Sequence, residues 1–68
     1  MDDDIDATGR RIAHILRERI ITGEIDMGDK LGERDIAEEL GVSRVPVREA
    51  LHVLEAEGFV SSAHRRAA

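Results

Sequence analysis

The stretch from Gly41 to Leu51 constrains the fold more than any other part of the chain. Gly41 can adopt the left-handed conformation that ends one helix, and Ser43 can cap the next. A turn this short with glycine at its start is typical of a helix-turn-helix. The apolar residues that follow lie at i, i+3, i+4 and i+7, the spacing of a helix face packed against a core: Val47, Ala50, Leu51 and Leu54.

The opposite face of this third helix contains Arg44, Arg48 and His52 at i, i+4 and i+8. On an arbitrary helix such a row is usually a solvated surface. Here the two arginines lie in the first turns, which a helix-turn-helix projects from the domain, and this position favours a role in binding. The helix is expected over about 44–57, with Pro46 as an alternative start because proline disfavours helical angles in the residue before it.

Two earlier helices are expected from the periodic spacing of apolar residues and from the glycines that flank these segments. The first covers about 8–22, where Ile12, Ile15, Leu16 and Ile20 share a face and Gly23 follows as a stop signal. Its arginines are expected to form a solvated face paired with Glu18, with a phosphate contact by Arg10 or Arg11 as the alternative. The second covers Glu33–Leu40, with Gly32 at the N-cap and Ile36, Ala37 and Leu40 turned inward.

Length and composition exclude several classes of protein. The chain has 68 residues, enough for one domain over 8–68 after an acidic, disordered tail at 1–7. Phe59 is the only aromatic residue, so there is no stacking platform for single-stranded nucleic acid. The sequence contains no cysteine, and the spacing of His14, His52 and His64 does not match a metal site. No apolar run is long enough to span a membrane. We therefore expect a cytoplasmic protein that is not an enzyme and has no cofactor or metal.

The net charge of −5 has the wrong sign for a simple nucleic-acid-binding protein. Four of the acidic residues lie in the first six positions, whereas Gly41–Val53 contains two arginines against Glu49. Because the local field decides where a phosphate can approach, the uneven distribution allows DNA binding at the third helix.

The segment Glu33–Leu40, followed by Gly41–Leu51 and Leu54–Val60, resembles the N-terminal domain of the GntR family of bacterial transcription regulators. The resemblance covers roughly residues 10–66. The amino-acid sequence of the helix-turn-helix is most similar to that of the FadR-type branch. The resemblance implies a mainly α, winged helix-turn-helix fold: a three-helix core with a small β-wing. Lys30 and Leu31 are expected to form a very short strand.

After Gly58, the strand-forming residues Phe59–Ser62 are expected to form the rising side of the wing. In the family a glycine and a return strand follow, whereas this sequence closes with Ala67 and Ala68. We therefore expect a truncated wing, with the backbone of the Phe59–Ser62 strand unpaired on its wing side.

The resemblance also implies roles for individual residues in binding double-stranded DNA. Arg44 and Arg48 would enter the major groove and pair with guanine, while Arg34 and Ser43 would contact phosphates. Arg34 lies in the first turn of its helix, where the dipole disfavours a cation, which hints at a function besides stability. The complete predicted set is Arg34, Ser43, Arg44, Val45, Pro46, Arg48, His64 and Arg65, the last two following the wing toward the minor groove.

Regulators of this family bind operators with two-fold symmetry as homodimers, through a C-terminal effector-binding domain that is absent from this sequence. The alternative is a winged-helix module that docks onto another protein, since fold alone does not fix function. A docking surface should be apolar or aromatic at its centre, whereas the exposed face of the third helix presents arginines.

Overall fold

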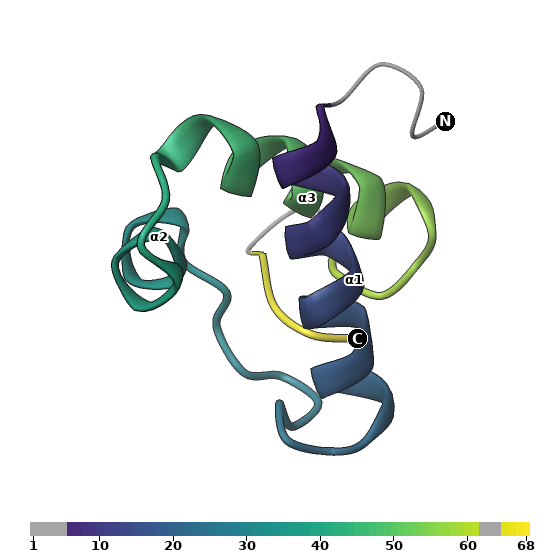
Figure 1. Ribbon diagram of the computed structural model, residues 1–68. Helices are drawn as coiled ribbons and strands as arrows, with labels where there is room; N and C mark the ends of the chain where they lie inside the picture. Colours follow the sequence, from purple (N-terminus) through teal and green to yellow (C-terminus); the bar gives the residue numbers. More distant parts are fainter. Residues whose placement is uncertain (1–5, 62–64) are drawn as a thin grey trace.

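The computed structural model describes residues 6–61 and 65–68, which contain three helices. Figure 1 shows their arrangement. The first helix, α1 (Ala7–Ile21), begins at Asp6, whose carboxylate accepts a hydrogen bond of 2.8 Å from the backbone N–H of Gly9. This is an N-cap, which satisfies one of the unpaired donors of the first turn. The helix therefore starts inside the range 1–7 that the sequence pattern assigned to a tail. Residues 1–5 lie outside the described part.

Two further helices form the helix-turn-helix. The second, α2 (Glu33–Leu40), has the predicted bounds and ends at Gly41, whose φ of 68° is left-handed as expected. The third, α3 (Arg44–Ala56), begins two residues before Pro46, so the alternative start is wrong. Proline is tolerated in this first turn because an N–H there has no intrahelical partner to lose.

The core lies between the three helices. From α3 it takes Val47, Ala50, Leu51 and Leu54, each at 0% exposure, as the predicted stripe requires. The other helices contribute Ile12, Ala13, Leu16, Ile36 and Ala37. Three buried residues lie outside the helices: Leu31, Val60 and Ala67. None of the helices in the described ranges is long and apolar enough to cross a membrane.

The C-terminal residues pair with two other segments, and this corrects the expectation that the strand after Gly58 lacks a partner. Val60 forms an antiparallel bridge with Ala67, and Lys30 forms one with Arg66. The N–H of Ser61 donates to the carbonyl of Arg66 at 2.8 Å, so the wing side of the strand is paired. The last residues thus lie beside both Val60 and the connection that leads into α2 (Figure 1). In the described residues there are three helices and only isolated bridges, so the mainly α fold class is confirmed.

Ion pairs fix α1 against the other helices, with partners that differ from the predicted one. The guanidinium of Arg17 donates to both carboxylate oxygens of Glu57, at 2.9 and 3.1 Å. Arg19 pairs with Glu39 of α2 at 2.7 Å and with Glu24 at 3.2 Å. The expected pairing with Glu18 is therefore wrong for these two arginines, because Arg17 pairs with Glu57 and Arg19 pairs with Glu39 and Glu24 instead.

Candidate nucleic-acid interface

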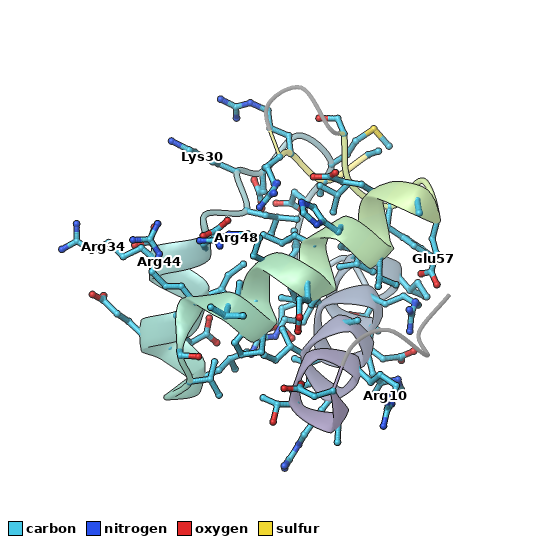
Figure 2. The ribbon with its side chains drawn as sticks, turned by 90° about the horizontal axis from the view of Figure 1, so that it is seen from above. Arg10, Lys30, Arg34, Arg44, Arg48 and Glu57 are labelled. Atoms are coloured by element: carbon cyan, nitrogen blue, oxygen red, sulfur yellow. The ribbon has the colours of Figure 1, made fainter. Side chains whose placement is uncertain are left out.

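Three arginines gather where α2 and α3 begin. The side chains of Arg34, Arg44 and Arg48 are 78%, 60% and 49% exposed. Figure 2 shows them on one side of the molecule with Lys30 nearby, while Arg10 and Glu57 lie on the other side. The short turn at Gly41 creates this arrangement, because it places the first turn of α2 next to the first turns of α3.

Glu33 lies at the centre of this arginine group. Both of its oxygens accept hydrogen bonds from Arg48, at 3.0 Å from Nε and 3.1 Å from Nη2. Arg44 approaches the same carboxylate at 3.6 Å and Arg65 at 3.2 Å. The Glu33 side chain is only 16% exposed, so the arginines largely cover it. We call Glu33, Arg44, Arg48 and Arg65 the Glu33 cluster.

The electrostatics of the cluster follow from these contacts. The hydrogen bond from Arg48 lowers the pKa of Glu33 below its usual value, and the charges of Arg48 and Arg65 act in the same direction. Partial burial opposes the shift. The same hydrogen bond raises the pKa of Arg48. At neutral pH the cluster therefore holds one carboxylate against three guanidinium groups and keeps a net positive charge.

The residues at the start of α3 differ in their exposure. Ser43 is the N-cap residue and is exposed, but its hydroxyl makes no capping hydrogen bond, so the predicted cap is only a backbone one. Val45 is 57% exposed. Pro46 is buried, and its ring therefore packs against the protein rather than facing solvent.

The wing residues of the predicted set are placed only in part. Arg65 pairs with Glu33 of α2 and, at 2.8 Å, with Glu55 of α3, which ties the base of the hairpin to both helices. Its φ of 52° is left-handed, a conformation that costs free energy for a residue with a Cβ. His64 lies outside the described residues.

Sequence reasoning missed Glu33 as a member of this site. The residue was predicted to lie in α2, but nothing in its local pattern shows that Arg65, 32 positions later, reaches the same carboxylate. The spacing from Glu33 to Arg48 across a short turn was the available signal. Within the described ranges, no group of three or more His, Cys, Asp or Glu residues could hold a metal ion.

Comparison with known proteins assigns this geometry to a family. The family model described as bacterial regulatory proteins, gntR family, matches residues 8–68. The chain belongs to the GntR family. It is 50% identical over 54 residues to the gluconate operon transcriptional repressor of Bacillus subtilis, a match that covers 79% of this chain and 22% of the repressor. It is 52% identical over 52 residues to the Exu regulon transcriptional regulator of Escherichia coli, covering 75% and 20%.

Two further comparisons agree. An uncharacterized HTH-type transcriptional regulator of Mycobacterium tuberculosis is 47% identical over 57 residues, which is 84% of this chain and 23% of that protein. A crystal structure of a GntR-family transcriptional regulator superposes with a TM-score of 0.78 at 34% identity, over 90% of this chain and 26% of that one. These relatives are regulators and not enzymes, and the GntR chain described here spans about a fifth to a quarter of their length.

Proposed function

We propose that this chain binds double-stranded DNA with sequence specificity, as the operator-reading domain of a bacterial transcription regulator. The observation that supports this best is the group of three exposed arginines where α2 and α3 begin, in a chain whose net charge is −5. An acidic protein gains nothing from overall attraction to DNA, so a local cationic face at the projecting end of a helix-turn-helix indicates a specific contact.

The geometry supports different roles for the exposed residues. Arg44 and Arg48 lie one helical turn apart on α3 and would enter the major groove, where a guanidinium pairs with O6 and N7 of guanine. Arg34 comes from α2, which crosses the backbone in this motif, and would contact a phosphate. The free hydroxyl of Ser43 would donate to a neighbouring phosphate, and Val45 could contact a thymine methyl group.

The structure favours an indirect role for two residues of the predicted set. Pro46 is buried and would shape the start of α3. Arg65 already pairs with two carboxylates and would hold the wing against both helices, so its own contact with DNA stays a prediction. The minor-groove contact of His64 also stays a prediction.

We further propose that the full regulator is a homodimer on an operator of two-fold symmetry, with a C-terminal effector-binding domain supplying the dimer interface. The relatives are nearly four times as long as this chain, which leaves room for such a domain. Assignment to the FadR-type branch rests on the amino-acid sequence of the helix-turn-helix. A repressor function rests on the likeness to the gluconate operon repressor.

Titration with duplex DNA tests the proposal. A fluorescent duplex obtained by repeated selection from a random library is titrated with the chain at low salt, and then with unlabelled random duplex as competitor. We expect weak binding that falls as salt rises, because one module makes few phosphate contacts, and a clear preference for the selected sequence. Absence of binding to any duplex would favour the protein-docking alternative.

A further inference from the structure

One carboxylate lies beneath the arginines that would read the operator. Glu33 contacts Arg48 through two hydrogen bonds and Arg44 through a longer ion pair. A negative charge in a DNA-binding face opposes the approach of phosphates, so its presence there requires a compensating function.

The atoms involved in the pair with Arg48 suggest that function. A guanidinium has five N–H donors, and two parallel donors point from its side edge (Nε and Nη2) and two from its end edge (Nη1 and Nη2). Glu33 occupies the side edge of Arg48, at 3.0 and 3.1 Å. In the described part of the chain Arg48 makes no hydrogen bond through Nη1. Among the described residues, nothing else bonds to the end edge, and the pair with Glu33 holds that edge in one orientation.

We infer that Glu33 is a specificity-determining positioning residue, which fixes the end edge of Arg48 for bidentate pairing with a guanine. This inference rests on the proposed DNA-binding function. A long arginine side chain normally loses rotamer freedom when it binds, and a partner that restrains it beforehand reduces that loss. Arg65 contributes by donating a second hydrogen bond to Oε2 of Glu33, at 3.2 Å.

The carboxylate has a second effect on specificity. Its charge weakens contacts with phosphates, which every duplex offers, while its hydrogen bonds favour a base contact that only the operator offers. Glu33 thus lowers the affinity for random DNA and raises the ratio of operator affinity to random-DNA affinity. A residue that merely masked the arginines would lower both affinities by the same factor.

The test compares affinities for the selected duplex and for random-sequence duplex across three variants. Glu33→Gln removes the charge, Glu33→Asp keeps the charge but shortens the reach, and Asp35→Asn is the matched control. Asp35 is the other acidic residue in the first turn of α2, and it has no part in the Glu33 cluster. Thermal melting of each variant checks that it is folded.

We expect Glu33→Gln to reduce the ratio of selected to random affinity by about two- to tenfold, with affinity for random duplex equal to or above that of the unaltered chain. Glu33→Asp should reduce the ratio without raising affinity for random duplex. Asp35→Asn should leave the ratio unchanged. A ratio unchanged in both Glu33 variants overturns the positioning role. No sequence preference in the unaltered chain overturns the proposed function itself, and this role with it.

Discussion

Val60 and Ala67 face each other in an antiparallel bridge, and both are only 3% exposed. The N–H of Ala67 also donates to the carbonyl of Asp29 at 2.9 Å, and the carbonyl of Ala67 accepts from Gly28 at 2.7 Å. Ala67 therefore joins the end of the chain to the connection before α2. The paired part of the wing, Val60 and Ala67, therefore belongs to the hydrophobic core and lies beside the connection that leads into α2.

Ala67→Asp should destabilise the domain strongly, because it places a charge without a partner in an apolar environment. We expect a loss of about 2–4 kcal/mol in the free energy of unfolding, a large part of the stability of so small a domain. Ala68→Asp is the control, since Ala68 is exposed. Thermal melting followed by circular dichroism compares the two variants, and equal melting temperatures would contradict the assigned packing of Ala67.

Gly41→Ala should weaken the helix-turn-helix through the backbone alone. The φ of Gly41 is 68°, and a Cβ added there would meet no atom within 4 Å, so the cost is conformational rather than steric. We expect a loss of about 1–2 kcal/mol. Gly41→Asn should lose less, because asparagine tolerates the left-handed region better. Denaturant titration measures both variants, and an equal loss for alanine and asparagine would contradict this explanation.

Acid should remove stability that ion pairs supply. The folded state lowers the pKa of Glu33 through its hydrogen bond from Arg48, and that of Glu39 through its hydrogen bond from Arg19, from the usual 4.5. Because the folded pKa is below the unfolded one, the stabilisation is fully present above the unfolded pKa and is lost as pH falls through the folded pKa.

Melting temperature measured as a function of pH checks this prediction. The unaltered chain should lose stability progressively below about pH 4.5. In that range Glu33 and Glu39 bind protons more readily in the unfolded state than in the folded state, which favours unfolding. Glu33→Gln and Glu39→Gln should each show a smaller decrease than the unaltered chain. Identical pH profiles for all three proteins would rule out these two carboxylates as the source.

The elements that the sequence predicted well have strong local signals. Gly32 and Gly41 mark both ends of α2, and the i, i+3, i+4, i+7 stripe of α3 is buried as expected. The features that could not be predicted from the sequence depend on contacts between residues far apart in the chain. A single buried alanine such as Ala67 has no periodicity to reveal it, and Arg17 selects Glu57, 40 positions away, over the nearby Glu18.

The capping of α3 shows a different kind of error. Ser43 has the backbone angles of an N-cap residue, but its hydroxyl makes no bond to the helix. Sequence patterns predict where a helix starts more reliably than which atom satisfies its first N–H groups, because exposed groups there can bond to water instead.

In the proposed function, the first turns of α3 read base sequence while Arg34 binds the DNA backbone. The most direct test is the ratio of affinities for selected and random duplex, measured for Arg44→Ala, Arg48→Ala and Arg34→Ala. Arg17→Ala is the matched control, because it removes the same charge from a residue paired with Glu57, on the far side of the molecule (Figure 2).

We expect Arg44→Ala or Arg48→Ala, or both, to lower the ratio about tenfold. Arg34→Ala should weaken binding to both duplexes equally, and Arg17→Ala should change neither affinity. Equal losses on selected and random duplex for all of Arg34, Arg44 and Arg48 would contradict the claim, because they would show that none of these arginines reads a base.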